Sequence, residues 1–323
     1  MSAIPAGIVA LLLLATGDAL AQTGVEALYL GCGAGASSET RARCGDAALT
    51  LQALHGGLGL LASAGGVLPA SPSTVGRRLA EQPRIVFDGG AVWASFRHPD
   101  LAAAPQDRGI PDRRALLVGG RLTTVVGIFE GFAPIPAAGG VLALDGVGTA
   151  QLLRLPRSDG FNGSVAGWGG GVRLGLVRES FSVPGVTLSA MHHRVGTVRF
   201  GEGADAPGAR VRIDPRVTSL RAVVGKDLLA VGFAGGVGWD RYGGEGRIEV
   251  TAPSGDASAG PEGLRLTRRY LFAGVNFTWV VAQAAGELAW GRPASLFEEM
   301  EGTGPFRPGA AELQGAVTFR ITY

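Results

Sequence analysis

The chain ends with the alternating stretch Leu313-Gln314-Gly315-Ala316-Val317-Thr318-Phe319-Arg320-Ile321-Thr322-Tyr323. Its odd-numbered positions are apolar residues or glycine, and its even-numbered positions are polar or small. A period of two residues is typical of a β-strand with one apolar and one polar face. The stretch therefore predicts a strand that closes the chain.

The same alternation appears in earlier parts of the chain. In residues 229–240, apolar side chains such as Phe233 and Val237 alternate with small residues and with Asp240. Strands of a membrane-spanning barrel have lipid on one side and a filled or watery lumen on the other, so they need one apolar face and one polar or small face. The clearest further segments are 168–176, 269–281 and 283–290, and less regular ones are 84–96, 116–132, 141–155, 186–200 and 211–224. We count about ten strands, or twelve if the long segments split.

The composition supports an exported β-rich protein. The chain has 54 glycines among 323 residues and is 46% hydrophobic. Beyond the N-terminal region it has no uninterrupted apolar stretch of about 18 residues that could span a membrane as a helix. The net charge of +2, from 29 basic and 27 acidic residues, gives no field that favours nucleic acid.

The N-terminus resembles a secretory signal peptide covering residues 1–21. Residues 8–14 form an apolar run, and Ala19-Leu20-Ala21 provides small residues for cleavage before Gln22. The run is too short to predict a spanning helix. No Lys or Arg precedes it, so an N-terminal membrane anchor stays an alternative.

With this signal peptide, its alternating strands and its aromatic terminus, the chain resembles the bacterial outer-membrane β-barrel superfamily. The resemblance implies an all-β fold, an antiparallel transmembrane barrel over residues 81–323 with a short N-terminal helical segment. It also implies Sec-type export to the outer membrane, contact with outer-membrane lipids, and recognition of Phe319 and Tyr323 by the barrel-assembly machinery. The alternative is a soluble β-sandwich, whose strands also alternate. The oligomeric state stays open.

Residues 22–80 form a separate N-terminal segment that contains both cysteines of the chain, Cys32 and Cys44. In an oxidising compartment two cysteines this close most simply form a disulfide. A metal site would need further ligands, and only His55 lies nearby, so we expect no metal and no cofactor.

A helix is expected between Ser37 and about residue 61. Ser37 or Ser38 suits its N-cap, and Gly56-Gly57 is expected to end or kink it. A linker follows at residues 68–73. We expect the helix to pack under the barrel mouth on the periplasmic side, and the alternative is a plug inside the lumen. A stripe at three- and four-residue steps supports the helix: Leu51, Leu54, Leu58 and Leu61.

Polar residues on otherwise apolar strands are candidates for the lumen wall. These candidates are Arg173, Asn276, Thr278, Glu287 and Arg320. Arg320 and Glu287, on consecutive strands, are expected to pair. Such residues could line a polar pore or fill a closed interior with salt bridges and hydrogen bonds.

A catalytic centre is not expected, although Ser189 lies close to His192 and His193. On one strand, Ser189 and His193 would be about 13 Å apart, too far for a nucleophile and its base. Arg194 should leave the bilayer through a bulge, a turn near residues 194–196 or an extramembrane extension, because an arginine facing lipid is costly. The glycines at 167–171 are expected to relieve crowding in the barrel wall.

The sequence thus predicts an outer-membrane barrel, with passive porin-like passage or small-solute or lipid uptake as its first function. The alternative is a structural or ligand-binding barrel with a closed interior and no transport. An outer-membrane hydrolase is a third and weaker hypothesis.

Overall fold

The computed structural model describes residues 23–76, 83–101, 112–132, 141–181, 183–201, 208–294 and 312–322. The predicted signal peptide, its cleavage site and the terminal Tyr323 lie outside these residues. Among the described residues, no helix is both long enough and apolar enough to cross a membrane. The described strands are β1 (Ile85–Pro99), β2 (Asp112–Phe129), β3 (Ala143–Arg154), β4 (Ser164–Val177), β5 (Gly185–Val195), β6 (Val198–Phe200), β7 (Ala209–Leu228), β8 (Val231–Val250), β9 (Ala257–Trp279), β10 (Ala282–Ala294) and β11 (Glu312–Thr322).

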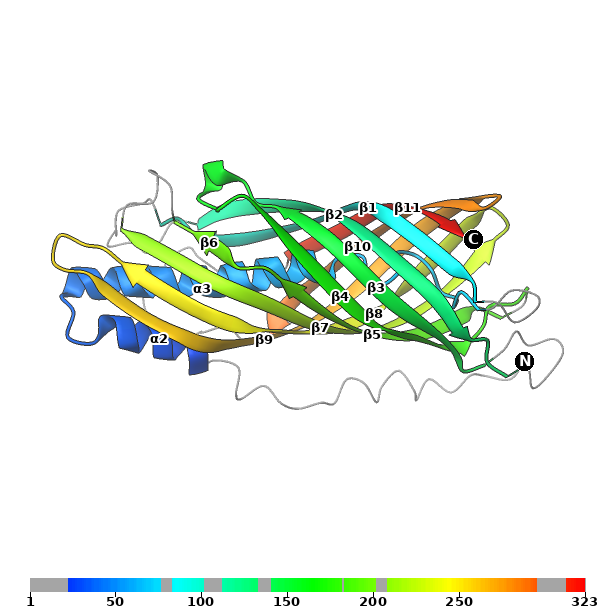
Figure 1. Cartoon of the computed structure of the whole chain (residues 1–323), viewed down its shortest axis with the longest axis horizontal. Helices are drawn as coiled ribbons and strands as arrows, with labels where there is room; N and C mark the ends of the chain where they lie inside the picture. The colour runs from blue at the N-terminus through cyan, green and yellow to red at the C-terminus, as the bar shows by residue number, and fades with distance from the viewer. Residues whose placement is uncertain are drawn as a thin grey trace.

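These strands form one antiparallel sheet that closes on itself (Figure 1). The order is β5-β4-β3-β2-β1-β11-β10-β9-β8-β7, and β5 then pairs with β7 to complete a ring of ten strands. The short β6 pairs with β7 beyond the end of β5. The predicted barrel of about ten strands is confirmed, and closure excludes the β-sandwich. The last strand lies between β10 and β1, with Arg320 opposite Asp88.

The barrel exposes apolar side chains and buries polar ones, the reverse of a water-soluble protein. On β9, Leu271, Val275 and Phe277 are about half exposed, at 49%, 52% and 54%, whereas Asn276 on the opposite face is 1% exposed. The same alternation continues around the ring and forms an outward apolar belt. Lipid is the solvent that such a belt fits.

The two ends of the barrel differ. Two-residue turns, 229–230 and 280–281, join β7 to β8 and β9 to β10 at one end, where β1 begins and β11 ends. We term this the short-turn end. At the opposite long-loop end, β7, β8 and β9 continue past their neighbours, as the leftmost strands of Figure 1 show.

The irregularity expected near Arg194 occurs just after it. The strand β5 ends at Val195, residues 196 and 197 leave the sheet, and β6 resumes the pairing at Val198. Arg194 keeps its place on the outward face, with its guanidinium carbon 6.0 Å from the ring centroid of Trp168 on β4.

Two helices precede the barrel, α2 (Thr23–Gly33) and α3 (Ser38–Ser63). Ser37 caps α3, accepting a hydrogen bond at 3.2 Å from the backbone N–H of Thr40. The helix does not end at Gly56-Gly57 but continues to Ser63, and the missing side chain of Gly57 makes room for the barrel wall. A Cβ atom on Gly57 would lie 2.3 Å from the ring of Phe96. The four predicted stripe leucines, Leu51, Leu54, Leu58 and Leu61, are all buried.

The helix α3 lies inside the barrel and not under its mouth, so the position we expected for it is wrong. It enters at the long-loop end and contacts β1, β7 and β8 from within (Figure 1). The following residues 64–76 continue through the interior, where Ala70 accepts a hydrogen bond from Asn276. They reach the short-turn end at Gly76, beside Gly127 on β2. The predicted linker is therefore the second half of a plug.

Candidate functional site

The interior of the barrel is the candidate site, and its long-loop half is apolar. Leucines of α3 pack there against inward side chains from opposite walls, including Phe96 on β1 and Ile248 on β8. Tyr242 lies against Gly59, where a Cβ atom would be 2.6 Å from the ring. Side chains fill this half at the spacing of a protein core, and it offers no aqueous path through the described residues.

The short-turn half is polar and is built around the backbone of residues 64–76. Asp145 on β3 receives two hydrogen bonds from Arg173 on β4, at 2.9 and 3.1 Å. The same carboxylate accepts the backbone N–H of Val75 at 3.0 Å. A barrel ion pair thus fixes the plug as well as the wall.

The predicted pair of Arg320 with Glu287 is not formed. Arg320 lies 3.3 Å from Asp88, which is its direct neighbour on β1, and it also donates to the carbonyl oxygen of Pro69. Glu287 pairs instead with Arg221, at 2.6 Å. The register explains the difference, because Glu287 faces Ala316 on β11, four residues away from Arg320.

Asn276 and Thr278 also point inward, at the short-turn end. Asn276 donates to the carbonyl oxygen of Ala70 at 2.8 Å and to Asp227 at 3.0 Å. The side-chain amide of Gln283 donates to Asn276 at 2.6 Å and to Thr278 at 2.8 Å. All five predicted lumen residues therefore lie on the inward face, and four of them are held in direct contacts with the plug or with a paired charge.

Sequence reasoning did not identify the contacts at the junction of helix and coil. Asp240 on β8 accepts hydrogen bonds from Ser63 at 2.7 Å, from Tyr242 at 3.2 Å and from Tyr270 at 3.3 Å. Arg121 donates to the carbonyl oxygen of Ala64, the residue after α3. The sequence does contain a sign that Asp240 is special. It is a single carboxylate at the end of a run of glycines and an alanine on the same face of the strand.

The serine and the histidines of β5 do not assemble a catalytic centre in the described residues. Ser189 and His193 are both buried on the inward face, but four positions separate them on one strand. His192 points outward and its Nδ1 lies 3.2 Å from the hydroxyl of Thr218. The β4 glycines provide room for the β5 side chains, since a Cβ atom on Gly169 would lie 2.6 Å from His193.

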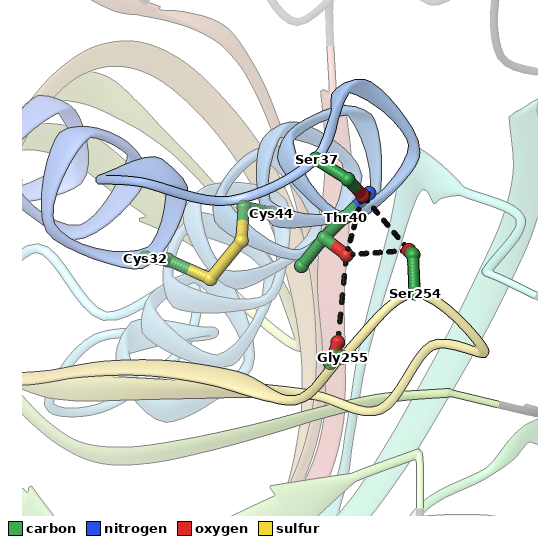
Figure 2. The surroundings of a disulfide bond; sticks show 6 residues. All are labelled: Cys32, Ser37, Thr40, Cys44, Ser254 and Gly255. Atoms are coloured by element: carbon green, nitrogen blue, oxygen red, sulfur yellow. Dashed lines mark hydrogen bonds between the residues drawn. A yellow bond between two sulfur atoms is a disulfide. The ribbon is translucent and has the colours of Figure 1, made fainter.

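A disulfide fixes the helical hairpin at the long-loop end (Figure 2). Cys32 at the end of α2 is bonded to Cys44 on α3, as the sequence predicted. Beside it, Thr40 and Ser37 form hydrogen bonds with Ser254 in the connection between β8 and β9, at 2.9 and 2.8 Å. Burial raises the pKa of Asp46 on α3 from its usual 3.8 to about 6, and the opposing effect of Arg43 is smaller.

The closed ring, the outward apolar belt and the inward charged network together define the type of protein. The protein has the architecture of a membrane-spanning β-barrel. This description rests on features of its own structure, which bury inward charged side chains such as Asp145, Arg221 and Glu287 and expose an apolar outer face.

No protein-family model matches the chain, and no curated protein sequence matches it. Among solved structures, it is similar to the translocator domain of the autotransporter NalP from Neisseria meningitidis, with 10% identity and a TM-score of 0.41 over 74% of this chain and 88% of that one. It is also similar to the outer membrane protease OmpT from Escherichia coli, with 9% identity and a TM-score of 0.36 over 75% and 96%. The attachment protein Ail of Yersinia pestis is similar at 10% identity, with a TM-score of 0.31 over 75% of this chain and 98% of that one. Such values describe a general likeness of barrels.

Proposed function

We propose that this protein is a plugged, non-conducting outer-membrane barrel that anchors the elements it presents at its long-loop end. The single observation that carries the proposal is the filled lumen. The helix α3 occupies the long-loop half, and residues 64–76 occupy the short-turn half. The closed-interior alternative is thereby favoured over passive porin-like passage or solute uptake, and the proposal includes no catalytic step.

The fit of the plug supports a permanent role. Backbone groups of Ala64, Pro69, Ala70 and Val75 all bond to inward side chains of the wall. Breaking these contacts together would remove a hydrogen-bond partner from two buried arginines, one asparagine and one carboxylate, and each such loss is costly in a buried site. A plug that left during solute passage would have to disrupt both this network and the apolar packing around α3.

The elements presented at the long-loop end are α2, the first turns of α3 and the extended parts of β7, β8 and β9. In bacterial barrels the short turns face the periplasm and the longer loops face the exterior. We therefore infer that the disulfide-bonded hairpin lies on the exterior side of the outer membrane, after Sec-type export. A rigid barrel is a suitable base for such a surface because its strands cannot hinge.

Planar-bilayer recordings test the proposal. The wild-type protein should insert without stepwise conductance. A variant lacking residues 23–76 should conduct if its heat-modifiable gel mobility shows a folded barrel. Stepwise wild-type currents would overturn the proposal. Their loss in the Ser63→Cys, Asp240→Cys variant under oxidising conditions, and their return on reduction, would trace them to a mobile plug. Because wild type alone gives the deciding measurement, the outcome does not depend on whether the deletion variant folds.

A further inference from the structure

A ring of outward arginines borders the apolar belt on the side of the long-loop end. Eight strands each place one exposed arginine at this level, and the other two strands of the ring, β4 and β11, place none there among their described residues. These ring arginines are Arg97, Arg114, Arg154, Arg194, Arg216, Arg241, Arg269 and Arg292.

The position of the ring matches the boundary between lipid tails and headgroups. On β9, Arg269 lies ten residues before Trp279 at the short-turn end. With the rise and tilt usual for barrel strands, this separation is about 25 Å along the membrane normal. That value equals the usual height of the apolar band of an outer-membrane barrel. Trp239 and Trp290 lie two positions inside Arg241 and Arg292, where interfacial aromatic residues are expected.

Three pairs of ring arginines lie directly opposite each other: Arg97 with Arg114, Arg269 with Arg292, and Arg194 with Arg216. The third pair lies where β5, β7 and β8 adjoin. Arg194 on β5 lies directly opposite Arg216 on β7, and Arg241 on β8 lies opposite Thr218, one step diagonally from Arg216. Directly opposed side chains have Cβ atoms about 5 Å apart, and like charges at that distance are destabilising. A bound anion above these three arginines would offset their mutual repulsion. We term Arg194, Arg216 and Arg241 the arginine triad.

Among the residues that the structure describes, no carboxylate fills this role at the same level. The outward carboxylates described nearest on these strands, Asp214 and Glu245, lie opposite each other one step farther from the belt. Asp214 accepts a hydrogen bond from Thr197. On the belt side of the triad lie His192 and Thr218, which are hydrogen-bonded to each other.

The chemistry of the arginine triad fits a phosphate. Guanidinium groups bind phosphate oxygens through two parallel N–H donors and keep their charge at any physiological pH. Trp168 fixes one side of the triad through its contact with Arg194. The level of the triad places its anion among the headgroups, with the acyl chains against the adjoining apolar belt.

We propose that the arginine triad binds the phosphate of a phosphorylated lipid headgroup in the membrane leaflet at the long-loop end. The acyl chains of that lipid lie along the outward apolar side chains of β5 and β7, such as Leu188 and Leu220. This inference depends on the outward apolar belt and on the arginines that border it on the side of the long-loop end. It does not depend on whether the lumen conducts, so it would stand even if the barrel proved to be an open pore.

Native mass spectrometry of the folded protein tests this site. The probe is a diphosphorylated lipid A glycolipid, with its dephosphorylated form and inorganic phosphate as comparisons. The wild-type protein should retain the phosphorylated glycolipid more strongly than the dephosphorylated one, and free phosphate should neither bind nor displace it. The double variant Arg194→Gln, Arg216→Gln should bind the phosphorylated glycolipid about thirtyfold more weakly than wild type. Each arginine removed takes away one electrostatic contact with the anionic headgroup, and the two losses add in free energy.

A second arginine pair gives the matched control. Arg212 and Arg247 also lie directly opposite each other on β7 and β8, but two outward steps beyond the triad. The variant Arg212→Gln, Arg247→Gln removes the same charge and should keep the wild-type affinity. Equal loss in both double variants would show attraction by net charge only, and unchanged binding in Arg194→Gln, Arg216→Gln would reject the site. Heat-modifiable mobility confirms that each variant is folded.

Discussion

The carboxylate of Glu287 on β10 lies 2.6 Å from the guanidinium of Arg221 on β7, although β9 and β8 separate these strands in the sheet. The pair therefore bridges the interior across the plug. The backbone of Gly66 passes directly over it, so closely that a Cβ atom there would lie 1.9 Å from Arg221. The plug and the two walls are thus tied at one point.

Glu287→Gln should destabilise the barrel by about 3 kcal/mol, because it leaves Arg221 charged and buried without its partner. Urea unfolding in detergent micelles measures the change in the free energy of unfolding. A double-mutant cycle should find strong coupling of Glu287→Gln with Arg221→Met and little with Arg320→Met. Stronger coupling with Arg320→Met would support the pairing that the strand order alone suggested.

Gly57→Ala should cost about 1–3 kcal/mol, because the added methyl group meets the ring of Phe96 inside a packed core. The neighbouring Gly56 is the matched control, since a Cβ atom there would be 3.4 Å from the nearest atom, on Leu266. Gly56→Ala should be neutral or stabilising, by up to about 1 kcal/mol from helix propensity. The temperature midpoint of heat-modifiable mobility separates the two, and equal midpoints would show that the plug does not fit this closely.

Loss of the disulfide should loosen the helical hairpin and spare the barrel. Closing a loop of twelve residues contributes about 3 kcal/mol in the chain-entropy model. The variant Cys32→Ser, Cys44→Ser should be cut by trypsin after Arg41 and Arg43 much faster than wild type, while the heat-modifiable midpoint changes little. Unchanged protection of these two sites would mean that packing of α2 on β9 holds the hairpin without the covalent bond.

Asp46 should make the hairpin less stable as the pH rises. It lies outside the apolar belt, because Leu51 one turn further along α3 already reaches Gly246, five residues past Arg241. A folded-state pKa of about 6, above the ordinary 3.8, means that the folded state binds the proton more tightly. The stabilising contribution is present below pH 4 and is lost between pH 4 and 6.

Asp46→Asn should therefore slow amide hydrogen exchange in residues 23–50 at pH 7.5, relative to wild type at the same pH, and change it little at pH 4.5. Hydrogen-exchange mass spectrometry at the two pH values gives the measurement. Glu39→Gln serves as the control, because it changes the same charge at the exposed start of the helix. An equal effect of both substitutions at pH 7.5 would point to net charge and not to burial of Asp46.

Much of the barrel could be predicted from the sequence, because lipid imposes a rule on every outward position. The alternation at residues 229–240 and 269–281 fixed both the strands and the direction of their faces, and Arg320 was placed inward on that basis. In the short-turn half, small or polar residues fill the opposite face, so the five lumen candidates could be chosen without knowing the register.

The partners of those residues could not be predicted in the same way. Arg320 meets Asp88 only because the last strand lies against the first, 232 positions away along the chain. The plug was missed for a related reason. The stripe of Leu51 to Leu61 indicates one buried face, whereas the glycines and alanines that let the other faces be buried also occur in loops and turns.

The path of the chain through its own barrel limits the order in which the molecule can assemble. The hairpin of α2 and α3 lies beyond one end of the ring, and β1 starts at the other. Two helices side by side are about 20 Å wide, so a finished ring would have to open to let them through. We therefore expect the strands to wrap around a plug that has already folded, with the meeting of β11 and β1 as the final step. Residues 23–76, the earliest described part of the chain, would then form the core around which the last strand closes.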